Sequence, residues 1–124
     1  MNAHHRSHQL WSVLAFAAFN RQIVSYALVG RLVGLPAAAI GRDLFPIQYF
    51  CHQRGLPPLT VLVVNQITGL PGNGLAVENF AKSIQEVFEF DWLAYNAPGR
   101  EVGPKAEDFE QASITQKKER GQAT

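Results

Sequence analysis

The chain has 124 residues and a formal net charge of +1, with 47% hydrophobic and 17% charged residues. This length suits one ordinary domain, and the composition supports a packed core, which excludes a wholly disordered chain. The longest apolar stretch, residues 11–19, is about half the length that crosses a bilayer, and no cleavage site of a secretory signal follows it. The single cysteine excludes an intramolecular disulfide and a thiolate-rich zinc site. We therefore expect a soluble, cytoplasmic protein without a membrane segment.

Charged residues are unevenly distributed along the chain. Up to Arg100 there are seven basic and five acidic residues, and the last 24 residues hold four basic and five acidic ones. Between Arg21 and Leu75 there are four arginines, no lysine and a single acid, Asp43. This mildly positive segment falls short of the basic stripe of a strong non-specific nucleic-acid binder. Guanidinium groups suit phosphate and guanine but also protein interfaces, so charge alone does not decide between these partners.

The first eight residues are polar and show no periodicity, which predicts a flexible N-terminus over residues 1–8. They include the three histidines His4, His5 and His8. A metal site needs ligands that a second shell holds in place, so we assign no metal and no other cofactor to this chain.

A helix is predicted over Gln9–Asn20, because apolar residues recur there at spacings of three and four. Phe16 and Phe19 widen the apolar stripe of this helix. The helix is therefore expected to be buried in the core or covered by a partner, and we favour the core. The extra aromatic residues also make a homodimer a reasonable hypothesis.

A helix-turn-helix outline follows. Residues 24–26 read as a short extended entry, and Ser25 is placed to cap a helix over Ala27–Val33. Gly34 is expected to end that helix. The apolar residues expected to share one side of it are Leu28, Val29 and Leu32.

The second helix of this outline is predicted over Ala37–Leu44, with Pro36 suited to its first turn. Ile40 is expected to face inward and Arg42 outward. Pro46 lacks an amide hydrogen and clashes one turn back, so it should interrupt or kink the helix.

The helical pattern resumes after this proline and closes at Gly55. Leu59–Val64 is β-branched and nearly continuously apolar, which predicts a strand, and the glycines and proline of Ile67–Leu75 predict a turn-rich loop. A strand and such a loop directly after a helix-turn-helix are what a winged helix requires. We therefore predict a mostly α fold with a small β element, a winged helix-turn-helix, as a single domain over residues 9–96.

The C-terminal third begins with a predicted helix over Ala76–Phe88, which is apolar on one face and charged on the other. Phe90 and Trp92 alternate with acidic residues, which indicates a short strand or a capping segment. From Ala97 onward, proline, glycine and mixed charges dominate. This composition predicts a tail over residues 97–124 that is disordered or ordered by a partner.

Five short segments of the chain form a recognisable series. They are Ile23-Val24-Ser25-Tyr26, Gly34-Leu35-Pro36, Ala39-Ile40-Gly41, Pro58 before the predicted strand, and Gly72-Asn73-Gly74-Leu75-Ala76-Val77. In this order, across residues 22–88, they resemble the C-terminal DNA-binding domain of alkylguanine-DNA alkyltransferases and the catalytically silent alkyltransferase-like proteins. The resemblance implies a recognition helix after the G-x-P turn and a glycine-rich loop before the last helix.

The departures from that family are equally specific. The family keeps its acceptor cysteine at the end of the proline-led strand, where this chain has Asn65, so the resemblance implies no dealkylation. The family's intercalating arginine corresponds to Ala38, which disfavours base flipping by the same means. Tyr26 matches a family tyrosine that contacts the DNA backbone, although it could equally be a core aromatic residue.

Catalytic chemistry has little support elsewhere in the chain. Cys51 and His52 look like an acceptor pair, but adjacent side chains on a helix point about 100° apart. We therefore favour a half-buried Cys51 that packs beside Phe50. The sequence has no paired-carboxylate site, no metal-ligand spacing, no phosphate-binding loop of the Walker type and no G-x-S-x-G motif. We expect a protein that is not an enzyme.

Two functions stay open at this point. The first is a non-catalytic winged-helix DNA-binding protein that contacts duplex DNA through the helix from Ala37 and a glycine-rich wing. The residues predicted to contact DNA are Ser25, Tyr26, Arg31, Arg42, Gln48, Gln53, Arg54 and Asn73.

The second function is a winged-helix module for protein interaction, such as a regulator or a mobile-element inhibitor of a host complex. Its docking residues would be Phe16 and Phe19, or the cluster of Phe45, Tyr49 and Phe50. The low net charge favours this second function, and the alkyltransferase-like order of motifs favours the first, since winged helices serve both roles.

Overall fold

The computed structural model describes residues 3–95 and 104–122. The elements in chain order are α1 (Ala3–Phe19), β1 (Val24–Ser25), α2 (Tyr26–Val33), α3 (Ala37–Arg54), the 3-10 helix η1 (Leu59–Leu62), β2 (Val63–Val64), α4 (Phe80–Glu89), α5 (Trp92–Tyr95) and α6 (Ala106–Gln122). The two short strands pair in parallel, with Val24 opposite Val63. The expectation of a mostly α fold with a small β element is confirmed.

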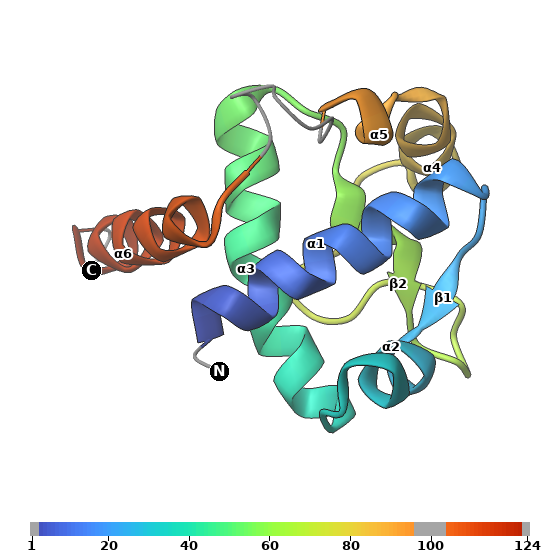
Figure 1. Cartoon of the computed structure of the whole chain (residues 1–124), viewed down its shortest axis with the longest axis horizontal. Helices are drawn as coiled ribbons and strands as arrows, with labels where there is room; N and C mark the ends of the chain where they lie inside the picture. Colours follow the sequence, from blue (N-terminus) through green and yellow to red (C-terminus); the bar gives the residue numbers. More distant parts are fainter. Residues whose placement is uncertain (1–2, 96–103, 123–124) are drawn as a thin grey trace.

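The core lies where α1 crosses α3, and η1, α4 and α5 also pack against α1 (Figure 1). Trp11 of α1 is at its centre. Its indole ring makes edge contacts with Phe50 of α3 and with Trp92 of α5, at 5.6 Å and 5.4 Å between ring centres. Trp92 is buried, and its indole nitrogen donates a 2.8 Å hydrogen bond to the carbonyl of Val87. Such edge-to-face aromatic pairs add stability beyond the area that they bury.

Helices α2 and α3 have the boundaries that the turn chemistry predicts. The Ser25 hydroxyl accepts a hydrogen bond from the Leu28 amide at 3.1 Å, which confirms the N-cap. Gly34 ends α2 in the left-handed conformation, with φ of +75°. Gly30 is buried, and a side chain there would meet the Leu35 carbonyl, so the turn between the two helices passes close to α2 at this point.

The burial of α2 differs from the prediction. Val29 is fully buried, but Leu28 and Leu32 are 45% and 59% exposed. The three residues therefore do not share one buried side, because β1 and α3 leave room for only a narrow stripe of this two-turn helix.

The predicted strand over Leu59–Val64 is wrong for its first four residues. Leu59–Leu62 form the 3-10 helix η1, in which the Val61 amide donates to the Pro58 carbonyl at 3.0 Å, and only Val63–Val64 pair with β1. All six residues are buried. A short, fully buried apolar run carries no periodicity that separates a strand from a helical turn, which explains the error.

Three further boundaries differ from the prediction. Helix α3 runs through Pro46 without interruption, and the carbonyl that this proline leaves without a partner belongs to the exposed residue Arg42, where water can reach it. Helix α4 begins at Phe80, because the Asn79 side chain caps it through the Lys82 amide. Trp92 starts the short helix α5 in place of the suggested strand.

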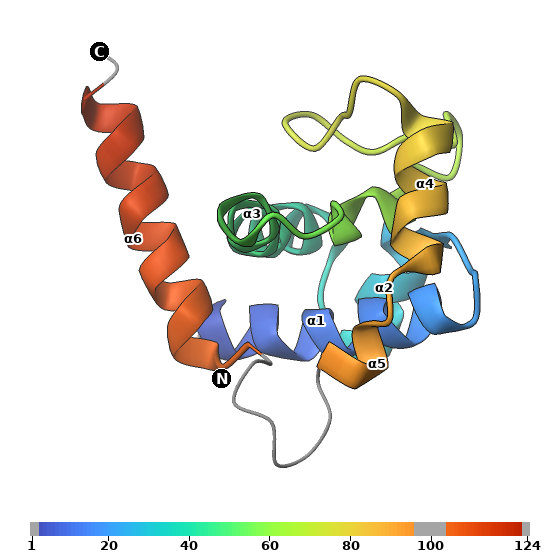
Figure 2. The ribbon, with the colours of Figure 1, turned by 90° about the horizontal axis from the view of Figure 1, so that it is seen from above.

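Both chain ends differ from the expectation. Residues 3–8 form the first turns of α1, where the Arg6 Nε lies 2.8 Å from the Asp43 carboxylate and the buried Ser7 hydroxyl donates to the Asp43 carbonyl. In the predicted tail, residues 106–122 form α6, which packs on α1 and α3 through the fully buried Phe109 (Figure 2). Residues 97–103 of that tail lie outside the described residues. Both ends are mostly polar, so these few buried contacts could not be predicted from their composition.

Candidate nucleic-acid interface

The glycine-rich loop after β2 is held across α2 and α3 by two hydrogen bonds. The Gly72 amide donates to the Tyr26 hydroxyl at 3.0 Å, and the Gln48 side-chain amide donates to the Gly74 carbonyl at 2.9 Å. Gly74 has a φ of +81°, and a Cβ there would lie 2.8 Å from the Phe45 ring. Glycine is therefore required at this position by both conformation and space. The loop is consequently fixed beside α3 by residues of both helices.

The first part of this loop is a turn that Asn65 organises. The Asn65 side-chain oxygen accepts from the amides of Ile67 at 2.8 Å and Thr68 at 3.2 Å. The Asn65 backbone amide donates to the Leu70 carbonyl at 2.9 Å, and its carbonyl accepts from the Gly69 amide at 2.8 Å. Asparagine is the residue type that makes such turns by bonding the backbone that follows it.

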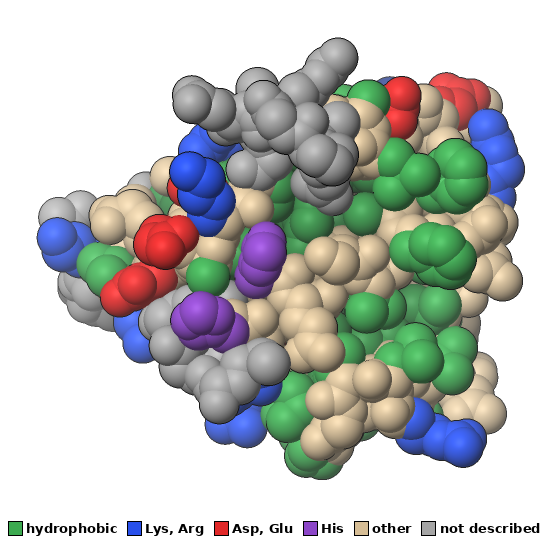
Figure 3. Space-filling view, viewed as in Figure 1, with side chains coloured by type: hydrophobic (Ala, Val, Ile, Leu, Met, Phe, Trp, Pro, Cys, Tyr) green, Lys and Arg blue, Asp and Glu red, His purple; other side chains and the backbone are tan. Residues whose placement is uncertain are grey.

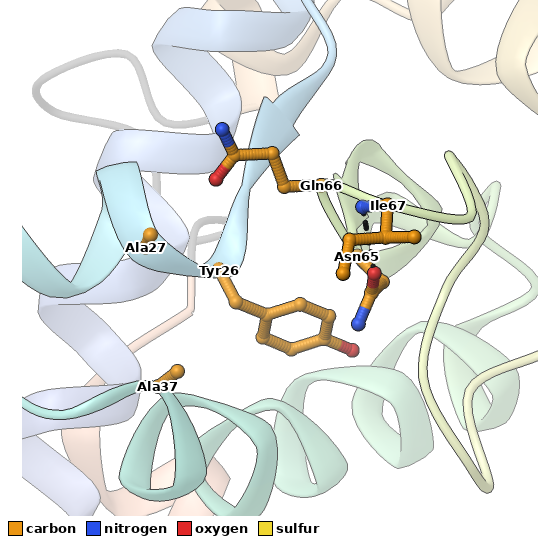
Figure 4. A pocket seen from close by; sticks show the side chains of 6 residues that line it. All are labelled: Tyr26, Ala27, Ala37, Asn65, Gln66 and Ile67. Atoms are coloured by element: carbon orange, nitrogen blue, oxygen red, sulfur yellow. Dashed lines mark hydrogen bonds between the residues drawn. The ribbon is translucent and has the colours of Figure 1, made fainter.

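A pocket of about 470 Å³ lies between this turn and the starts of α2 and α3 (Figure 4). Its lining residues are Tyr26, Ala27, Ala37, Asn65, Gln66 and Ile67. The Tyr26 ring extends from the start of α2 toward Asn65 (Figure 4). The polar groups around the pocket are a phenol and two carboxamides, which can form hydrogen bonds but supply no nucleophile at neutral pH.

On α2 and α3, the acidic side chain is buried and the arginines are exposed. Asp43 is 6% exposed and faces α1, where it pairs with Arg6. Arg31 and Arg42 are exposed, and neither has an ion-pair partner among the residues that the structure describes. The outer surface of this helix pair therefore carries positive charge without a neighbouring carboxylate of its own.

The structure brings some of the predicted contact residues together and gives others a different role. Ser25 and Tyr26 lie at the start of α2, with one hydroxyl engaged in the cap and the other in holding the loop. Arg42 and Gln53 are exposed, and their spacing of eleven residues places them on one stripe of α3. Asn73 is exposed in the turn that precedes Gly74.

Gln48 and Arg54 are two further predicted contacts that the structure uses internally. The Gln48 amide is engaged by the loop, as described above. The Arg54 guanidinium lies 4.7 Å from the centre of the Phe50 ring. Burial raises the pKa of Tyr95, and the attraction and hydrogen bond of Arg54 oppose that shift. Twelve residues at 100° each also place Arg54 about 120° around the helix from Arg42, so it lies off the stripe that Arg42 shares with Gln53.

Cys51 is buried and inert in this arrangement. Its side chain is 1% exposed, and burial raises the pKa of the thiol from 9.0 to about 12, slightly offset by a hydrogen bond with the Leu59 backbone. His52 beside it is exposed. A thiol that stays protonated is a poor nucleophile, so these neighbours do not form a reactive pair.

A second surface feature is an apolar face on α1 and α2, visible as hydrophobic side chains gathered over these helices (Figure 3). Its exposed members are Phe16 (63%), Phe19 (63%), Ile23 (46%), Leu28 (45%) and Leu32 (59%). The expectation that α1 is a core helix is confirmed for Leu10, Trp11 and Leu14 but is wrong for the two phenylalanines. Of the other predicted docking residues, Phe45 and Tyr49 are half-buried, and Phe45 contacts the loop at Gly74. The prediction is wrong for Phe50, which is 2% exposed and packs in the core.

Sequence reasoning predicted a turn-rich loop over Ile67–Leu75 but missed the pocket beside it and the role of Asn65 in the turn. Asn65 was noted for what it replaces and not for a role of its own, although asparagine is one of the residue types that favour turns. Ile67 and Gln66 carried no pattern that would mark them. Across residues 3–95 and 104–122, no group of three or more potential metal ligands is found, and no helix is long and apolar enough to cross a membrane.

Comparison of the chain with known protein families, with curated proteins and with solved structures finds no match. The functional interpretation therefore depends on the geometry described above.

Proposed function

We propose that this chain is a non-catalytic DNA-binding protein in which α2 and α3 act as a winged helix-turn-helix with an alkyltransferase-like order of motifs. The outer stripe of α3 would enter the major groove, where Arg42 and Gln53 reach base edges. Ser25, Tyr26 and Arg31 would contact phosphates. The loop at Asn73 would lie along the minor groove as the wing.

The observation that carries this proposal is the distribution of charge on α2 and α3, where the arginines are exposed and the acid is buried. Residues 1–77 contain five arginines and one acid, and that acid, Asp43, is buried against Arg6. The exposed arginines of α2 and α3 therefore meet an anionic backbone without repulsion from a nearby carboxylate. Two arginines at the centre of the interface support weak to moderate, salt-sensitive binding.

The same site supports the absence of alkyl transfer. Asn65 stands where the family that the chain resembles keeps its cysteine, and its side chain is already engaged in the turn. A carboxamide does not accept an alkyl group from guanine. Cys51 is buried in α3 beside Leu59 of η1 and cannot substitute for the missing acceptor.

The proposal is tested by a fluorescence-anisotropy titration of labelled random-sequence duplex with the full chain and with Arg42→Ala. We expect low-salt binding at micromolar protein and about a tenfold loss in Arg42→Ala, the size expected for one guanidinium contact. Raising the salt should weaken binding by both proteins, since the proposed phosphate contact of Arg31 is present in each.

A matched control is Lys105→Ala, which removes the same charge from an exposed residue immediately before α6. This variant should bind within about twofold of the wild type, since specific contacts act locally. An equal loss in both variants would mean that only net charge matters. No binding by the wild type at low salt would remove the proposed function.

A second candidate function is protein interaction through the apolar face of α1 and α2. The exposure of Phe16 and Phe19 favours it, because monomeric proteins rarely leave contiguous apolar patches uncovered. A sedimentation coefficient that rises with protein concentration, and that Phe19→Ser returns to the monomer value, would support a homodimer formed through this face.

A further inference from the structure

Ile67 is the most exposed of the large hydrophobic side chains among the described residues, at 94%. It contributes almost nothing to the core, so folding gives no reason for an isoleucine at this position. An isolated exposed apolar residue usually needs no explanation. Ile67 differs from that case because its backbone is held unusually well for a loop residue.

Hydrogen bonds hold the backbone of the turn that carries Ile67. The Ile67 amide is bonded to the Asn65 side chain, and the Asn65 backbone closes the turn on both sides through Leu70 and Gly69. The Leu70 amide also bonds to the Thr68 hydroxyl at 3.2 Å. A side chain on such a turn loses little further backbone freedom when it binds, and this pre-organisation favours affinity.

The position of the turn connects it to the proposed interface. Ile67 lines the pocket at the starts of α2 and α3, together with Tyr26 and Ala37 (Figure 4). The loop that carries it is tied to Tyr26 through Gly72. Ile67 therefore occupies the same side of the molecule as the starts of the two helices that we propose to face DNA.

We propose that Ile67 is an apolar wedge that inserts between adjacent base pairs of bound duplex DNA. Isoleucine and leucine are among the side chains that minor-groove proteins insert in this way, which partly unstacks one base step and bends the duplex. Leu70, 50% exposed on the same turn, would widen the wedge. The wedge rests on the proposed DNA binding and adds to it a specific mode of contact with the bases.

The experiment uses the full chain and duplexes that carry 2-aminopurine, a fluorescent adenine analogue whose emission rises when it is unstacked. We expect the wild type to raise the emission at a step within the bound site, and Ile67→Ala to lose most of that rise. Ile67→Leu should keep it. Affinity should fall by less than about tenfold in Ile67→Ala, because phosphate contacts dominate binding.

Leu32→Ala is the control, because it shortens another exposed apolar side chain, 59% exposed on α2, outside the turn. It should leave the emission unchanged. If the wild type binds DNA without a rise in emission, or if Ile67→Ala keeps the full rise, the wedge is overturned and DNA binding stands. If the wild type does not bind DNA at all, both the wedge and the proposed DNA binding are overturned. A concentration-dependent self-association that only Ile67→Ala removes would assign the residue to a protein contact and would also overturn the wedge.

Discussion

Asp43 illustrates how a single side chain controls the character of the α2–α3 surface. It is one of the three polar or charged residues that the structure describes as buried, and its two partners, Arg6 and Ser7, both come from the first turns of α1. A buried carboxylate needs a paired cation and hydrogen bonds to offset the loss of its hydration. The pair therefore neutralises the only acid of the region and also anchors the start of α1 to α3.

Cys51 leads to a prediction about reactivity. Because its folded-state pKa of about 12 lies above the unfolded value near 9.0, the folded thiol stays protonated at neutral pH. We predict that alkylated-guanine duplex adds no mass to the protein and that a thiol reagent labels native Cys51 slowly but labels the chain in urea quickly. Rapid labelling of the native protein at neutral pH would contradict the buried position of this residue.

The same shift predicts a dependence of stability on pH. A raised folded-state pKa contributes stability that is fully present below about pH 9 and is lost as the pH rises toward 12. The free energy of unfolding should therefore fall in this range, and it should fall less steeply in Cys51→Ala. Equal slopes for both proteins would show that the thiol does not contribute.

At the scale of elements, α6 is held by a small number of contacts. Phe109 packs against Trp11 at 5.9 Å and Phe50 at 5.4 Å between ring centres, and Ala112 is 2% exposed. The rest of the helix is half-buried or exposed wherever its side chains are described. The attachment of α6 therefore depends mainly on one aromatic side chain.

We predict that Phe109→Ala lowers the free energy of unfolding by about 3–5 kcal/mol, the usual cost of removing a buried phenylalanine. Urea denaturation followed by tryptophan fluorescence measures this directly, since Trp11 is in contact with the ring. Ile114→Ala, on the same helix but 41% exposed, should change stability by less than about 1 kcal/mol. A negligible effect of Phe109→Ala would mean that α6 does not pack as described.

The elements that the sequence predicted well are those whose ends depend on local chemistry. Ser25 caps α2, Gly34 ends it and Gly55 ends α3, because each role follows from one side chain or from one left-handed residue. Leu59–Leu62 was misassigned because its conformation depends on tertiary packing. The order of both chain ends could not be predicted, since it depends on Asp43 and Phe109 finding distant partners.

The candidate site was predicted less completely than the fold. Tyr26 was identified from the alkyltransferase-like resemblance and Arg42 from its outward position on the second helix, but their spatial relation to the loop depends on Gly72 and Gly74 packing closely against α2 and α3. Gln48 illustrates the same limit. Its polar side chain on the predicted helix suggested a base contact, and only the folded loop shows that its amide is engaged by Gly74.

At the scale of the whole molecule, the net charge of +1 conceals two halves of opposite character. Residues 1–77 hold five arginines and one acid, whereas residues 78–124 hold six basic and nine acidic residues. Net charge therefore says little about the surface that a partner would meet. The acidic half should limit long-range attraction to nucleic acid, so binding should depend on short-range contacts and weaken with salt.

The most direct test of the central proposal is to map the interface by NMR on the isotopically labelled full chain, titrated with a short duplex at low salt. We predict that amide shifts concentrate at the starts of α2 and α3, along the exposed stripe of α3 with Arg42, and in the loop over residues 65–74. The amides of Phe16 and Phe19 should stay unchanged. An absence of shifts, or shifts confined to the apolar face of α1 and α2, would contradict DNA binding through this surface.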